Sequence, residues 1–154
     1  MFKNVQQLRN LETIENELKN NTCGILSFYT QEEKIVQLAV TFIYLDKNVY
    51  IFPTSEDEMF DKIHIEVKSS FTVLRNIKPK KRVELDNLPT YDFLSISIKG
   101  FLKRVEEQKL MDDLVKNYSM KYVKEFNEST DLPVFNKIFF IDTEEIQAVE
   151  ETGG

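Results

Sequence analysis

The alternation of apolar and polar positions between residues 22 and 52 predicts three consecutive β-strands. Residues 22–30 and residues 35–45 form two runs rich in β-branched and aromatic side chains, and residues 49–52 form a third. The turns between the runs are short, as at residues 46–48. Because connections of this length join neighbouring strands in opposite directions, we expect an antiparallel meander.

Further strands are predicted in the second half of the chain. Residues 69–75 are apolar, and residues 91–105 alternate well between apolar and polar side chains. Gly100 lies inside this second run, where glycine often marks a β-bulge or a sharp bend. Residues 134–141 predict another strand, and residues 146–149 predict a short final one.

Helices are predicted where the apolar spacing changes to three or four residues. An amphipathic helix is expected over residues 3–20, a short one over residues 56–63 and a longer one over residues 106–126. Residues 76–89 are a polar connection with two prolines, and residues 150–154 are expected to form a loose tail.

The order of these elements decides the fold class. Strands do not alternate singly with helices, which argues against a doubly wound parallel sheet. We predict a single, mainly β domain over residues 1–154, an antiparallel split β-barrel of six or seven strands. It should carry an N-terminal helix and a second helix between the last long strands. A chain of 154 residues is long enough for one ordinary hydrophobic core.

Composition narrows the partners. The net charge of −6 argues against nucleic acid and against an anionic membrane surface, both of which select basic proteins. Cys23 is the only cysteine, so no disulfide can form within the chain, which is typical of a reducing compartment. The chain shows no signal-peptide pattern and no apolar run of membrane-spanning length. A cytoplasmic protein is therefore expected.

Several kinds of chemistry are excluded by the residues that the chain lacks. It contains four glycines, Gly24, Gly100, Gly153 and Gly154, and no GxGxxG or P-loop can be assembled from these positions. His64 is the only histidine, so a zinc site rich in His and Cys is excluded, and we expect no metal. His64 is most simply a packed or surface residue, with a ligand contact or haem ligation as alternatives.

Two charged segments leave alternatives open. Glu56, Asp57, Glu58 and Asp61 follow a serine at a predicted helix start, where carboxylates favour the helix dipole. Paired carboxylates also serve in acid–base chemistry or bind hard metal ions. Residues 78–82 are basic and lack interleaved aromatic residues, which favours a solvated loop over a phosphate contact.

The order of the segments resembles the pyridoxamine 5′-phosphate oxidase-like family, the FMN-binding split β-barrels. The resemblance extends from the first predicted helix to Val149 and depends on the succession of short motifs. These are residues 24–28, residues 40–44, residues 49–52 followed by Thr54 and Ser55, residues 71–74, residues 96–101 with Glu106 and Glu107 after them, and residues 139–142.

This resemblance implies a homodimer with FMN in a groove at the subunit interface. The isoalloxazine ring would lie along the second and third strands of the meander, and the phosphate would lie at the start of the short helix. Where the family usually has basic residues this chain has Glu56, Asp57 and Glu58, so other cations are required. The implied cofactor-binding residues are Ala39, Val40, Thr41, Phe42, Thr54, Ser55, Lys62 and Arg75.

The function implied by the resemblance is that of an FMN-dependent oxidoreductase. Electrons would pass from a reduced nicotinamide to an unknown small substrate, and no residue is indicated as a catalytic acid or base. The alternative is a non-catalytic dimeric binding module of the same fold, which holds haem, another flat ligand or no cofactor.

Overall fold

The computed structural model describes residues 3–53, 60–61, 63, 66–77, 91–127 and 131–153. The described part of the chain forms seven strands and two helices, with the meander and the later strands close to their predicted positions. The elements are β1 (Lys3–Leu8), α1 (Leu11–Asn20), β2 (Gly24–Tyr29), β3 (Ile35–Leu45), β4 (Asn48–Phe52), β5 (Val67–Ile77), β6 (Tyr91–Arg104), α2 (Gln108–Tyr122) and β7 (Phe139–Gly153).

Some sequence predictions fall on residues outside these ranges. Most of the predicted short helix over residues 56–63 lies outside them, and so does the basic segment at residues 78–82. The same holds for His64 and for three predicted cofactor-binding residues, Thr54, Ser55 and Lys62.

The strands form one antiparallel sheet that closes on itself. The sheet order is β1-β7-β4-β3-β2-β5-β6, and β6 also pairs with β7, which closes strands β2 to β7 into a barrel. The predicted meander of β2, β3 and β4 is confirmed. Asp46 and Lys47 connect β3 to β4 with φ values of 49° and 66°, as in the tight turns that match the twist of a hairpin.

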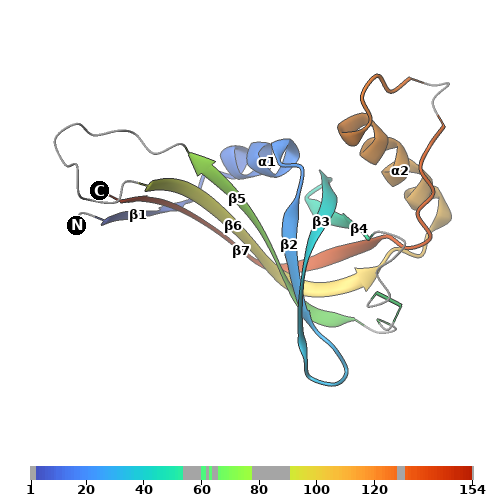
Figure 1. Cartoon of the computed structure of the whole chain (residues 1–154), viewed down its shortest axis with the longest axis horizontal. Helices are drawn as coiled ribbons and strands as arrows, with labels where there is room; N and C mark the ends of the chain where they lie inside the picture. Colours follow the sequence, from blue (N-terminus) through green and yellow to red (C-terminus); the bar gives the residue numbers. More distant parts are fainter. Residues whose placement is uncertain are drawn as a thin grey trace.

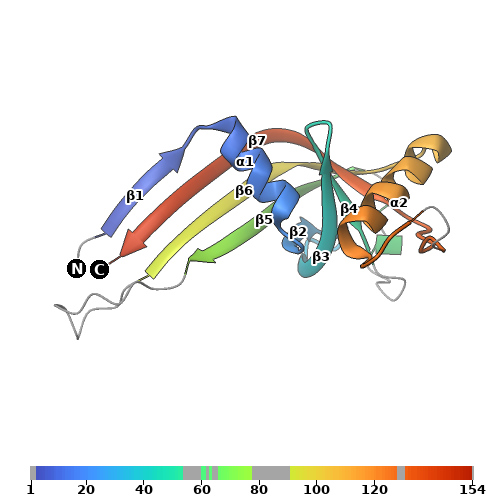
Figure 2. The same cartoon turned by 90° about the horizontal axis from the view of Figure 1, so that it is seen from above.

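The barrel is split along β7. β6 accompanies β7 along its whole length, whereas the other side of β7 pairs with β4 at Phe139 and Phe140 and with β1 from Ala148 to Gly153. β1, β5, β6 and β7 therefore extend together beyond the barrel (Figure 1 and Figure 2). The predicted antiparallel split barrel, with one helix between the two last long strands, is confirmed.

The predicted helix over residues 3–20 is wrong in its first half. Lys3–Leu8 is strand β1, and α1 begins only at Leu11. The Asn10 side chain caps the helix by accepting a hydrogen bond from the Thr13 backbone N–H at 3.3 Å. The apolar side chains of residues 3–8 fit the spacing of a helix and that of a strand. The segment forms a strand because the edge of β7 supplies hydrogen-bond partners for its backbone.

The end of the chain also differs from the prediction. In place of two strands over residues 134–141 and 146–149 and a loose tail over residues 150–154, β7 runs without interruption from Phe139 to Gly153. Residues 142–145 in its middle are polar, so the sequence predicts an interruption between two strands there. It is held as a strand because β6 pairs with it throughout, and β1 pairs with its end.

The bulge predicted at Gly100 is confirmed. The pairing of β6 with β7 shifts between Lys99 and Gly100, which leaves Glu144 as the extra residue of β7. A Cβ atom at position 100 would lie 2.0 Å from the backbone oxygen of Asp142, so the two strands can approach this closely only with glycine.

Two hydrophobic clusters stabilise the fold. The first fills the barrel, where the rings of Phe42 and Phe71 lie 4.8 Å apart and Leu18 of α1 is fully buried. The second lies between α2 and the outer side of β3 and β4, where the Phe52 ring packs against Tyr118 at 4.5 Å. Among the described residues, no helix has the length and apolar character needed to cross a membrane.

Candidate functional site

The side chains of β2 alternate between the barrel interior and its outer side. Leu26 and Phe28 are buried, whereas Ile25, Ser27 and Tyr29 point outward. The strand register places outward side chains of five strands in two adjacent rows, which we call the open face. One row is Ala39, Ile25, Thr72, Ser97 and Gln147, and the next is Gln37, Ser27, Ser70, Lys99 and Glu145.

Apolar side chains are exposed on and around the open face. Ile35 is 65% exposed and Leu74 is 60% exposed, and Ile25, Tyr29 and Val5 lie on the same side of the sheet. Large apolar side chains gathered on one exposed surface are typical of a ligand or protein interface.

The floor of the open face is made of small hydroxyl residues. The hydroxyl oxygens of Thr72 and Ser97 lie 3.3 Å apart and share a hydrogen bond, and the Gln37 side-chain amide donates to the Ser27 hydroxyl at 3.3 Å. These contacts satisfy polar groups within the sheet and keep the side chains low. A flat group can therefore approach the strands closely over this area.

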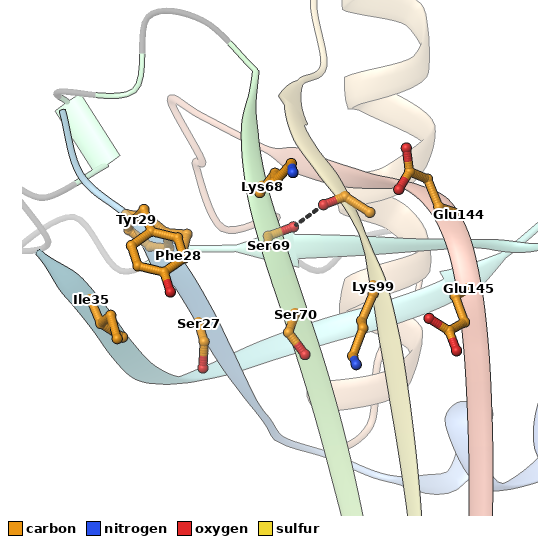
Figure 3. A pocket seen from close by; sticks show the side chains of 11 residues that line it. Ser27, Phe28, Tyr29, Ile35, Lys68, Ser69, Ser70, Lys99, Glu144 and Glu145 are labelled. Atoms are coloured by element: carbon orange, nitrogen blue, oxygen red, sulfur yellow. Dashed lines mark hydrogen bonds between the residues drawn. The ribbon is translucent and has the colours of Figure 1, made fainter. Parts of the chain in front are cut away.

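A pocket of about 790 Å³ lies on the open face. Tyr29 and Ile35 line one end of it, and Glu144 and Glu145 of β7 line the other (Figure 3). Between them lie small residues of β2 and β5 together with Lys68 and Lys99. The pocket thus combines an apolar end, a cationic middle and an acidic rim.

The two lysines of the pocket have their charges available. Lys68 and Lys99 are exposed, and among the described residues no carboxylate oxygen lies within 4.0 Å of either ammonium group. The buried hydroxyl of Ser69 donates to the backbone oxygen of Gly100 at 3.2 Å and ties β5 to β6 beside them (Figure 3). A rigid sheet therefore presents two cations to any anionic group that enters the pocket.

Helix α2 forms a wall at one end of the open face. The hydroxyl oxygens of Thr41 and Tyr118 lie 3.1 Å apart. The Tyr122 hydroxyl accepts from the Phe42 backbone N–H at 3.0 Å, and its hydrogen faces the backbone oxygens of Phe42 at 2.7 Å and Thr22 at 2.8 Å. Burial raises the pKa of Tyr122 to about 12, so the hydroxyl stays protonated and remains a donor.

The four predicted ring-binding residues of β3 point in two directions. Ala39 is exposed on the open face, and Thr41 lies partly exposed at its border with α2. Val40 and Phe42 are buried inside the barrel, with exposures of 6% and 0%. Only the first pair is therefore placed to contact a ligand on the open face through side chains.

Arg75 lies apart from these residues. It pairs in register with the buried Leu94, so it points to the side of the sheet that carries α1, and its guanidinium forms an ion pair with Glu17 of that helix. The structure thus brings Ala39 and Thr41 together and places Arg75 on the opposite side of the sheet. The predicted roles of Thr54, Ser55 and Lys62 remain predictions.

The sequence did not single out Lys68, Lys99, Ser27 or Ser70. A usable signal was the alternation in residues 91–105, which places Lys99 on the polar side opposite Ile96 and Ile98. What alternation could not show is that Ser27 and Ser70 meet Lys99 in one row, because this depends on the register of three strands.

Comparison with solved structures identifies the architecture. The chain has a TM-score of 0.70 with a proposed 5-nitroimidazole antibiotic resistance protein from Bacteroides thetaiotaomicron, at 9% identity over 99% of this chain and 91% of that one. An FAD-binding protein from Mycobacterium smegmatis gives 0.64, at 9% identity over 94% and 98%. A proposed pyridoxamine 5′-phosphate oxidase from Corynebacterium glutamicum gives 0.63, at 14% identity over 96% and 98%.

These likenesses show that the chain has the split β-barrel fold of pyridoxamine 5′-phosphate oxidase-like proteins. At identities this low they establish the fold and not the activity. A scan with protein-family models finds no match to the sequence, and a comparison with curated proteins finds none either.

Proposed function

We propose that the protein is a homodimer that binds a flavin nucleotide on its open face and works as an oxidoreductase. FMN is the expected cofactor, with FAD as the larger variant, and the electrons would pass from a reduced nicotinamide to a small substrate. The observation that carries the proposal is the pocket of about 790 Å³ on the open face. A bound flavin would supply the redox chemistry, while the protein positions it and excludes water.

The residues of the pocket fit such a group. Its volume lies within the usual range for small-molecule sites, about 300–1,000 Å³. The low floor of Ser27 and Ser70 admits a planar ring, and Tyr29 and Ile35 offer apolar contacts. Lys68 and Lys99 can neutralise a phosphate, which carries close to two negative charges. The two glutamates of β7 would repel it, so the phosphate should lie on the lysine side.

The exposed apolar side chains support a second copy as the cover of this face. A two-fold axis presents the same surface on both subunits, so one interface buries the exposed apolar residues of each. Ile25, Ile35 and Leu74 would lose most of their exposure in such a dimer. A ligand between the copies would then be shielded from solvent.

The names of the structural neighbours agree with this proposal. One is described as FAD-binding and another as a proposed pyridoxamine 5′-phosphate oxidase. The cytoplasmic location expected from the single cysteine remains part of the proposal.

A fluorescence titration with FMN and with FAD tests the cofactor. Wild-type protein should quench or shift flavin fluorescence with saturation, whereas Ala39→Arg should weaken binding at least about tenfold, because it places a long side chain on the exposed floor. Val134→Arg is the matched control, since Val134 is 88% exposed and lies outside the open face. Wild-type protein that leaves both flavins unaffected would refute flavin binding.

The phosphate contact has its own test. Lys99→Gln should weaken FMN binding at least about tenfold and leave riboflavin binding unchanged, because one charge-assisted hydrogen bond contributes about 1.5–3 kcal/mol. An absorption scan of the purified protein separates the alternatives. A haem band without flavin bands would favour the binding module over the flavoenzyme.

A further inference from the structure

A second hollow of about 310 Å³ lies apart from the open face. It is bounded by the end of α1, the end of β3 and the end of α2, and both ribbon views draw β3 between the two helices (Figure 1 and Figure 2). Lys19 and Lys121 contribute its two cations, and Ile43, Leu45 and Met120 contribute apolar surface. No carboxylate side chain of the described residues lines it.

Lys121 is the unusual member of this group because it is half-buried and no described residue supplies it with a counter-charge. Its ammonium nitrogen donates to the backbone oxygen of Phe42 at 3.1 Å and lies 4.0 Å from the centre of the Phe42 ring. Among the described residues no carboxylate lies within 4.0 Å of this nitrogen. An ammonium group has three donors, and the described residues supply one hydrogen-bond acceptor together with the faces of the Phe42 and Tyr122 rings.

The electrostatic surroundings favour an anion at this position. Burial of a cation without a partner is unfavourable, and it lowers the pKa of Lys121 to about 8, so the group is still mostly protonated at pH 7. The other cation is Lys19 on α1. On β3, burial together with the nearby Glu15 carboxylate raises the pKa of Tyr44 to about 12, and burial raises that of Tyr122 on α2 to about 12, so both phenols stay neutral.

We propose that this hollow binds small monocarboxylates with a short apolar chain. The carboxylate lies against Lys121 and Lys19, supplying the missing counter-charge, and the chain lies against Ile43, Leu45 and Met120. The volume of about 310 Å³ is at the lower end of the range for small-molecule sites and is large enough for a short-chain carboxylate. The site is independent of a flavin and of the open face.

The test is an NMR titration of the wild-type protein at pH 7 with hexanoate and, as the uncharged match, hexanol. Hexanoate should shift the backbone amides of Ile43, Leu45 and Lys121 with a dissociation constant on the order of 1 mM, as expected for so small a ligand. Hexanol should bind at least about tenfold more weakly, because it lacks the charge. Equal binding of the two, or no shift at these residues, overturns the proposal.

Variants identify the cation. Lys121→Met should weaken hexanoate binding about tenfold or more, and Lys121→Arg should keep it within about threefold, because the charge is retained. Lys116→Met is the matched control, since Lys116 is an exposed lysine of α2 that does not line the hollow, and it should bind as the wild type does. Unchanged affinity in Lys121→Met contradicts the assignment.

A pH series with the wild-type protein tests the role of the Lys121 charge even if Lys121→Met fails to fold. Hexanoate affinity should fall as the pH rises from 7 to 9.5, because Lys121 loses its proton around pH 8 in the free protein. Lys121→Arg should show no such fall, since arginine stays charged. A wild-type affinity that is flat over this range contradicts the proposal.

Discussion

The outer side of β3 is divided into two halves that face different surroundings. Ile43 is covered by α2 and Thr41 hydrogen-bonds to Tyr118, so this half belongs to the second hydrophobic cluster. Ile35, Gln37 and Ala39 continue the same side of the strand and are exposed. The outward side chains at one end of β3 are therefore covered by α2 of the same chain. Those at the other end are not covered by any described residue.

The difference lies in what the chain supplies for each half. The covered half meets an aromatic group in which the ring of Tyr118 lies 4.4 Å from Tyr122 and 4.8 Å from Phe135. The open half meets a low floor of hydroxyl residues and two lysines that form no ion pair with any described residue. We infer that the first half stabilises the subunit and that the second is kept for a ligand and a second copy.

The largest expected contrast comes from truncating one apolar side chain in each half. Phe52→Ala should lower the free energy of unfolding by about 3–5 kcal/mol, because Phe52 is 1% exposed and packs on Tyr118 and Phe135. Ile35→Ala should lower the free energy of unfolding of the monomer by less than about 0.5 kcal/mol, since Ile35 is 65% exposed.

Urea unfolding at protein concentrations low enough to favour the monomer measures both values. If both variants lost a similar free energy of unfolding, the two halves of β3 would contribute equally to stability, which contradicts the proposed difference between them. A concentration-dependent loss confined to Ile35→Ala is the result expected if a second copy covers the open half.

Much of the fold could be predicted from the sequence because local patterns and tertiary pairing agree there. The meander, the long strand β6, the bulge at Gly100 and helix α2 follow from alternation, helical spacing and one glycine. The two errors have one cause. β1 and the end of β7 are ambiguous or polar in sequence, and they become strands by pairing with each other and with β6.

The candidate site was less accessible from the sequence. Ala39, Val40, Thr41 and Phe42 were predicted together as the ring wall, whereas in the structure Ala39 is exposed and Val40 and Phe42 face the core. Four consecutive residues of a strand cannot all face one ligand, because successive side chains point to opposite faces of the sheet. Lys68 and Lys99 lie 31 positions apart and meet only through the pairing of β5 with β6, which no local pattern reveals.

The next contrast is between two tyrosines of α2, Tyr122 and Tyr118, which lie at the border between the two halves of β3. Tyr122→Phe should lower the free energy of unfolding by about 1–3 kcal/mol, because it leaves the backbone N–H of Phe42 without its acceptor. Tyr118→Phe removes only the bond to Thr41, and Thr41 also donates to the backbone oxygen of Phe52 at 3.4 Å, so about 1 kcal/mol or less is expected. Thermal and urea unfolding check the order, and a larger loss for Tyr118→Phe would contradict it.

The smallest effect is a pH dependence that arises at the covered half. The pKa of Lys121 is lowered to about 8 in the fold and is near 10.5 in the unfolded chain, so between these values the unfolded chain binds more protons. Stability should therefore rise from pH 8 towards pH 10, by about 1 kcal/mol once screening by solvent is allowed for.

Urea titrations at pH 7, 8, 9 and 10 measure this rise. Lys121→Met should flatten the curve, while Lys116→Met should keep it, since Lys116 is exposed. A wild-type stability that falls over the same range would contradict the burial of an uncompensated lysine. Above pH 10 the raised pKa values of Tyr44 and Tyr122 act in the opposite direction, because both phenols are favoured in their protonated form by the fold.

We propose that a second copy covers the open half of the sheet, with a flavin between the two subunits. Native mass spectrometry of the protein after incubation with FMN tests it in a single spectrum, with Ala39→Arg alongside. We expect a dimer that carries flavin mass for the wild type and a flavin-free species for the variant. A wild-type monomer without flavin mass at saturating FMN would contradict both the dimer and the bound flavin.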